Sequence, residues 1–164
     1  MKRSKLQEMF DCVPEIDFDS GFRYFLCNVQ NYSRALLSIL KSMKSKMPIM
    51  NVMLQTGEYE GLRSITQTLN KMLHNIGAFS LAEASYEVER SLLNDESNTM
   101  TELLTDYIGR LVTFSQHLEL LFKNTDFKNL PSIDEDAVSY FNYDFTKTKE
   151  SIKRSSDLLG RKII

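Results

Sequence analysis

Glycine, proline and cysteine are scarce in this chain, and tryptophan is absent. The 164 residues include six glycines, three prolines and two cysteines, Cys12 and Cys27. So few turn-forming residues, with no sustained alternation of apolar and polar residues, favour helices over strands. Two thiols and no secretory leader are typical of a reducing compartment, which predicts unlinked cysteines and a cytoplasmic location.

Charge and apolar runs exclude further classes of protein. The net charge is −2, whereas nucleic-acid binders cluster Lys and Arg to neutralise phosphates. No stretch approaches the roughly 18–20 apolar residues that cross a bilayer. The two histidines have no nearby cysteines, and a structural zinc site takes four ligands. No glycine-rich phosphate loop, catalytic triad spacing or Glu-x-x-His pair occurs. We therefore expect no enzyme activity, cofactor, metal, nucleic-acid partner or membrane span.

Apolar residues recur at spacings of three and four in four long segments. These predict helices over residues 31–55, 58–76, 80–93 and 99–123. Pro48 predicts a kink or split in the first segment, and Thr56 with Gly57 predicts its end. A short helix capped by Asp19 or Ser20 is expected before them, whereas residues 1–13 form a short helix or fray. Because each stripe must be buried, the sequence predicts an all-α, antiparallel up-and-down four-helix bundle.

Residues 57–78 resemble the core of histidine phosphotransfer (HPt) domains. In that family, a His-x-Leu-Lys-Gly motif is followed by a glycine ten residues after the histidine, and Leu69 and Gly77 fit this pattern. The histidine, the lysine and the first glycine are replaced by Gln67, Asn70 and Lys71. Gln67 also lies ten residues after Gly57, as the family's histidine does.

The resemblance covers roughly residues 13–124, which it implies are an HPt-like four-helix bundle with a short helix before it. Pro48 sits where many members of the family carry a proline. Residues 125–164 lie outside the resemblance and are expected to form a helical extension or linker. A stripe from Val138 to Leu159 predicts a further helix, capped by Ser132 or Asp134. That helix either packs back on the bundle, forms a homodimer or leads to another domain.

The last residues, 160–164, resemble the opening of the first strand of a response-regulator receiver domain. This resemblance suggests that the chain is part of a longer signalling protein in which a receiver domain follows.

Phosphotransfer requires a neutral imidazole in mid-helix, pointing at solvent. Gln67 lies opposite the apolar stripe and is expected to face solvent, but a carboxamide nitrogen is not a nucleophile because its lone pair is delocalised. The resemblance therefore implies a non-catalytic module that docks or regulates a receiver domain, in cis or in trans, without accepting phosphate at Gln67. The residues expected to form the docking surface are Ser64, Gln67, Asn70, Lys71 and His74.

Several alternatives stay open. Lys71 replaces a glycine, so its bulk blocks the receiver or its ammonium group meets the receiver's acidic pocket. His74 lies two turns beyond Gln67, displaced by roughly 10 Å, and is a candidate substitute phosphoacceptor or simply a surface histidine near a helix end. His117 is expected on the flank of the bundle. A third hypothesis is a purely structural bundle that dimerises through its C-terminal helix.

Overall fold

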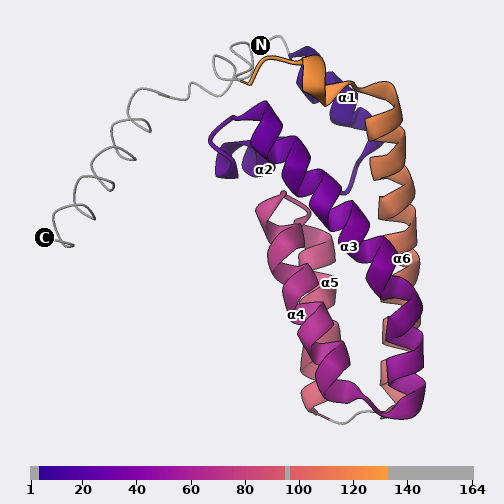
Figure 1. Ribbon diagram of the computed structural model, residues 1–164. Coiled ribbons are helices and arrows are strands. Elements are labelled where there is room, and N and C mark those ends of the chain that lie inside the picture. Colours follow the sequence, from indigo (N-terminus) through magenta and orange to yellow (C-terminus); the bar gives the residue numbers. More distant parts are fainter. Residues whose placement is uncertain (1–3, 95–96, 133–164) are drawn as a thin grey trace, which may run out of the picture.

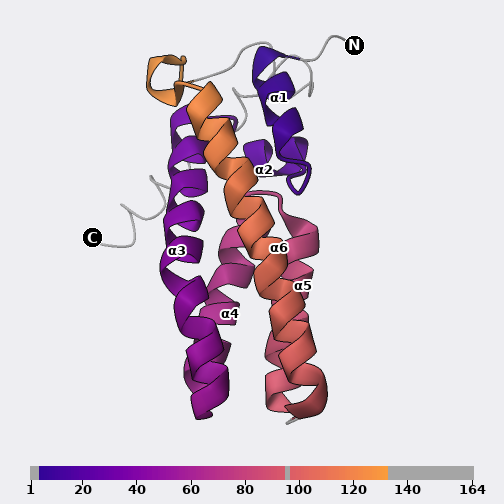
Figure 2. The ribbon, with the colours of Figure 1, turned by 90° about the vertical axis from the view of Figure 1, so that its right-hand side faces the viewer.

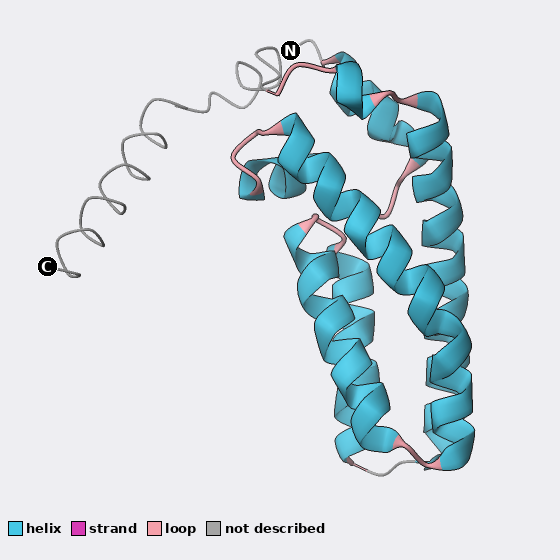
Figure 3. Cartoon of the chain, in the orientation of Figure 1, coloured by secondary structure: helices cyan, strands magenta, loops and turns pink. Residues whose placement is uncertain are grey.

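The computed structural model describes residues 4–94 and 97–132, and these are helical almost throughout (Figure 3). The elements are α1 (Lys5–Met9), the 3-10 helix η1 (Phe10–Cys12), α2 (Phe18–Tyr24), α3 (Val29–Thr56), α4 (Tyr59–Asn75), α5 (Phe79–Leu93), α6 (Ser97–Asn124) and the 3-10 helix η2 (Phe127–Asn129). The predicted all-α class is confirmed over the described part of the chain.

Four long helices, α3 to α6, lie side by side and share one core (Figures 1 and 2). α4 packs against α3 and α5, and α6 packs against α5 and α3. The apolar stripes supply most of the buried side chains, including Leu36, Leu69, Val88 and Leu111. Each large apolar side chain contributes about 1.5–3 kcal/mol when fully buried, so the shared core holds the helices together.

The ends of these helices lie within two residues of those predicted. Asn28 caps α3, its side-chain oxygen accepting the N–H of Asn31 at 2.9 Å. Gly57 ends α3 in the left-handed conformation, with a φ of 74°. Gly77 occupies the turn between α4 and α5 with a φ of 92°. α3 is a single helix of 28 residues that includes Pro48, so the prediction that it splits there is wrong. Figure 1 shows a continuous, curved helix.

The chain before α3 folds over one end of the bundle (Figure 1). α1 begins with a reciprocal capping box, in which the side chains of Ser4 and Gln7 each accept the other's backbone N–H. The rings of Phe10 and Tyr32 stack with their centroids 5.5 Å apart, and Phe18 packs beside both. This buried aromatic cluster orders the N-terminal segment, which local sequence left undecided between helix and fraying.

α2 is capped by Asp17, so the predicted caps Asp19 and Ser20 are wrong. The Asp17 carboxylate accepts the N–H of Ser20 at 3.3 Å. The backbone N–H of Asp17 donates to the carbonyl of Gly77 at 2.9 Å. This long-range bond holds Asp17 just outside the helix, where its side chain can cap the first turn.

The backbone of α2 lies in close contact with the backbone of the α4–α5 turn. A Cβ atom at Gly21 would lie 2.1 Å from the carbonyl oxygen of Ile76, and one at Gly77 would lie 2.3 Å from that of Asp17. The buried hydroxyl of Tyr32 donates to the Ile76 carbonyl at 2.8 Å. Burial also raises the pKa of Tyr32 far above its ordinary value. Gly21 and Gly77 therefore allow the two backbones to approach closely, and the hydrogen bond from Tyr32 stabilises the contact.

The end of α6 turns back onto the start of α3. The Gln30 amide donates to the carbonyls of Phe127 and Leu130, at 2.6 and 3.1 Å. The Phe127 ring is buried against Phe10 and Phe122. The N–H of Val29 donates to the carbonyl of Ser132 at 2.7 Å. The core therefore includes side chains on both sides of the range 13–124.

The predictions for the remaining C-terminal residues lie outside the described residues. They are the capping role of Asp134, the stripe from Val138 to Leu159, dimerisation through that helix and the receiver-like residues 160–164.

Candidate functional site

The predicted docking residues all lie on α4, the most strongly amphipathic of the long helices. Ser64, Lys71 and His74 are exposed along it, and Thr68 extends this exposed row between them. The row arises because residues at spacings of three and four share one helix face. The structure therefore places three of the five predicted residues on one open face of α4.

Gln67 is half-buried rather than fully exposed, so it departs from the predicted orientation. Its side-chain nitrogen donates to a carboxylate oxygen of Glu89 on α5 at 2.7 Å. A hydrogen bond to a charged group contributes on the order of 1.5–3 kcal/mol when partly shielded from water. The Gln67 amide is thus engaged in a bond to the neighbouring helix.

Asn70 makes a second link between the same two helices. Its side-chain nitrogen donates to the backbone carbonyl of Ala82 on α5 at 3.0 Å, and Asn70 is half-buried. Gln67 and Asn70 therefore both link α4 to α5. Lys71, the next residue along α4, stays exposed.

Glu89 is the residue of this site that sequence reasoning missed. On the same helix, Glu87 pairs with Arg90 at 2.7 Å, whereas Glu89 is half-buried beside α4. Its spacing of four from the buried Ser85 is the signal that would have placed it at the edge of the buried stripe.

In the interior of the bundle, a hydrogen-bonded pair of polar side chains joins α5 to α6. The hydroxyl groups of Ser85 and Tyr107 form a short hydrogen bond, and both side chains are buried. Burial raises the pKa of Tyr107 to about 12, against the lowering effects of the Ser85 bond and the Arg110 charge. α5 is therefore tied on one side to α4 and on the other to α6.

The histidines differ in their surroundings. His74 is exposed and meets the ring of Phe79 edge-on, with centroids 5.0 Å apart. His117 is on the flank of the bundle, as expected, where its Nδ1 lies 2.7 and 2.8 Å from the two carboxylate oxygens of Glu15. His117 thus joins α6 to the segment before α2. Of the two imidazoles, only that of His74 lies near the α4 face.

Cys12 and Cys27 form no disulfide in the described structure. Burial raises the pKa of the Cys12 thiol, and its sulfur donates to the Met9 carbonyl. A raised pKa leaves little reactive thiolate at neutral pH. The described residues bring together no group of three or more side chains suited to a metal ion. None of the described helices has the length and apolar character needed to cross a membrane.

Comparison of the chain with models of protein families, with curated proteins and with solved structures finds no match.

Proposed function

We propose that this chain is an HPt-like signalling module that docks a receiver domain and accepts no phosphate at Gln67. The up-and-down order of an HPt bundle is part of this proposal. One observation carries it: Gln67 lies at the middle of α4, ten residues from each of two left-handed glycines, Gly57 and Gly77. These glycines lie in the turns before and after α4. HPt domains have glycines at the same two distances from their histidine.

The surroundings of Gln67 support docking rather than transfer. The carboxamide is not a nucleophile, and Glu89 places a carboxylate 2.7 Å from its nitrogen. This negative charge opposes an incoming phosphoryl group, because like charges repel strongly where water is partly excluded. The site is therefore inert in two respects, through the missing imidazole and through the carboxylate beside it.

Lys71 supplies the attractive contact in this proposal. Its exposed ammonium lies one helical turn from Gln67, where it faces an acidic receiver pocket. A hydrogen bond to a charged group contributes about 1.5–3 kcal/mol, and ordering a lysine side chain costs up to ~2 kcal/mol. We expect a net contribution of about 1 kcal/mol, or roughly fivefold in affinity.

Titration of the isotope-labelled chain with a panel of isolated receiver domains tests the proposal. We expect amide shifts to concentrate on α4 around Ser64, Lys71 and His74, and Lys71→Ala to weaken binding about fivefold. Lys5→Ala is the matched control, because Lys5 is an exposed lysine of α1. Shifts that avoid α4, or equal weakening by both variants, would overturn the docking surface.

Restoring the family's residues tests whether the scaffold still fits a receiver. The variant combines Gln67→His, Asn70→Lys and Lys71→Gly, with Glu89→Gln added to remove the opposing carboxylate. It loses both links between α4 and α5, so its helicity and unfolding midpoint must be measured first. A folded variant is expected to take phosphate from a phosphorylated receiver, whereas the triple variant that retains Glu89 takes less. A folded variant that takes none argues against a retained docking geometry.

The exposed imidazole of His74 favours one rival, phosphotransfer through a displaced histidine. Incubation of the unaltered chain with a phosphorylated receiver decides it. An acid-labile adduct that disappears in His74→Ala would establish transfer and replace the docking proposal.

A further inference from the structure

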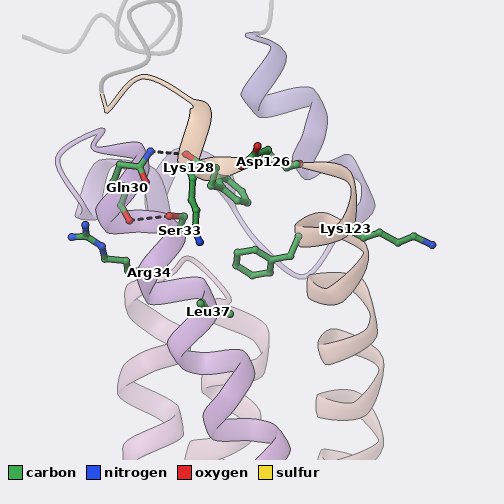
Figure 4. A pocket seen from close by; sticks show the side chains of 10 residues that line it. Gln30, Ser33, Arg34, Leu37, Lys123, Asp126 and Lys128 are labelled. Carbon is green, nitrogen blue, oxygen red and sulfur yellow. Dashed lines mark hydrogen bonds between the residues drawn. The ribbon is translucent and has the colours of Figure 1, made fainter.

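A hollow lies at the end of the bundle where α6 turns back onto α3, and none of its lining residues belongs to α4 (Figure 4). Its volume is about 560 Å³. The first turns of α3 form one wall, with Ser33, Arg34 and Leu37. The end of α6 and η2 form the other wall, with Phe122 and Phe127 among the lining residues. The hollow has an apolar base, because Phe127 is buried and Phe122 is half-buried there.

The rim of the hollow is basic. Arg34, Lys123 and Lys128 line it with one acid, Asp126. In Figure 4 the Lys128 side chain extends down from η2 toward α3, and Arg34 and Lys123 extend outward on opposite sides. Asp126 accepts a hydrogen bond from the Asn129 side chain. Within residues 4–94 and 97–132, none of the three cations forms an ion pair. The rim therefore carries a net positive charge, because three cations face one carboxylate.

A buried polar atom also lines the hollow. Thr125 is 6% exposed, and its hydroxyl oxygen has no hydrogen-bond partner among the described residues. Buried hydroxyl groups are nearly always bonded, since an unmet hydrogen bond costs about 1–3 kcal/mol. This hydroxyl suits an occupant that brings a hydrogen-bond acceptor, as a carboxylate does.

The sequence that follows this place is rich in carboxylates. The carbonyl of Ser132 accepts the N–H of Val29, at the start of the α3 wall. Three consecutive acids, Asp134, Glu135 and Asp136, follow directly in the sequence. Two to four residues span about 7–14 Å when extended, so these acids are within reach of the hollow. Their charge of −3 complements the three cations of the rim.

We propose that residues 134–136 of this same chain dock on the hollow, with their carboxylates against Arg34 and Lys128. The contact is electrostatic at the rim, where opposite charges a few ångströms apart attract and added salt screens them. It forms a binding site for an acidic segment at the end of the bundle remote from the α4 turn at Gly57. This inference does not depend on the proposed receiver docking.

Carbodiimide cross-linking of the full-length chain tests the proposal, because it joins amines to carboxylates in direct contact. Arg34→Lys keeps the charge and places an amine on α3, a hundred residues from the acids in sequence. We expect links from residue 34 to residues 134–136, weakened severalfold by high salt. Lys41 is an internal control, because it is exposed on α3 two turns further along. Equal linking of residues 34 and 41 to these acids would overturn the proposal.

Two further measurements separate the other occupants. Mixing isotopically light and heavy chains before linking distinguishes contact within a chain from contact between copies, and mixed links would assign the hollow to a second copy instead. Neutralising Asp134, Glu135 and Asp136 to amides is expected to shift the amide resonances of Gln30 and Ser33. The matched control neutralises three later acids, Asp144, Glu150 and Asp157. Equal shifts in both variants, or none in either, would contradict the assignment.

Discussion

Replacing Gly21 by alanine tests the tight crossing of α2 over the α4–α5 turn. The new Cβ would lie 2.1 Å from the Ile76 carbonyl oxygen and 2.6 Å from the Tyr32 hydroxyl oxygen. Because these atoms belong to a backbone and to a bonded hydroxyl, α2 must move by about 1 Å to restore ordinary contact distances. That movement strains the bonds from Tyr32 to Ile76 and from Asp17 to Gly77.

The expected cost of this substitution follows from three contributions. Overpacking costs about 1–3 kcal/mol, and weakening two buried hydrogen bonds adds about 1 kcal/mol each. Alanine regains about 0.5–1 kcal/mol because glycine is a poor helix former. We therefore expect Gly21→Ala to lower the free energy of unfolding by about 2–4 kcal/mol.

Gly109→Ala is the matched control, because Gly109 is an exposed glycine within α6 with nothing within 4 Å of its Cβ position. The same substitution there is expected to raise stability by about 0.5–1 kcal/mol. Urea unfolding followed by far-UV circular dichroism measures both effects, and an unchanged denaturant slope would show that the unfolded states are comparable. If the two variants change stability in the same direction, the close crossing is wrong.

Three other predictions address strain, burial and pairing. Leu26 is 37% exposed with a φ of 56°, so Leu26→Gly is expected to raise the unfolding free energy by up to ~1 kcal/mol, and a clear loss would argue against strain there. Burial raises the pKa of Tyr107 to about 12 in the folded state, against an ordinary 10. The contribution of the buried, neutral Tyr107 to the free energy of unfolding is therefore complete below pH 10 and is lost as the pH rises toward 12. Stability should fall by up to ~3 kcal/mol across that window, and Tyr107→Phe should flatten the fall in alkaline unfolding curves, whereas Tyr24→Phe, at an exposed tyrosine, should not. Glu15→Gln and His117→Ala should each cost about 1 kcal/mol, and a double-mutant cycle should show coupling; additive effects would mean that the pair contributes nothing.

The long helices were predictable from the sequence because their signals are local and repeated. Each stripe spans several turns, and Gly57 and Gly77 mark two of the boundaries, so the predicted bounds of α3 to α6 fall within two residues. Pro48 shows the limit of such rules. A proline removes one hydrogen bond, and a 28-residue helix packed against two neighbours retains enough others to continue through it.

The N-terminal segment was less predictable, because its structure depends on distant partners. Asp17, Asp19 and Ser20 carry similar capping signals, and the choice among them is made by the Gly77 carbonyl, sixty residues away. α1 and η1 are too short to show a period, and they are ordered by burial of Leu6 and Phe10.

Only part of the candidate site could be predicted. The exposure of Lys71 and His74 follows from the helical period. The bond from Gln67 to Glu89 does not, because it depends on how far α4 is rotated toward α5 and on how the two helices align along their length. Neither quantity is encoded in the spacing within a single helix.

The Phe10–Phe127 and Val29–Ser132 contacts determine which side of the bundle stays accessible when the protein is attached at one end. They place residues 4 and 132, the ends of the described chain, at one pole of the bundle, while the α3–α4 turn at Gly57 occupies the other (Figure 1). Tethering the protein at this pole therefore leaves the long flank of α4 running along the tether axis. A partner protein would then approach that flank from the side.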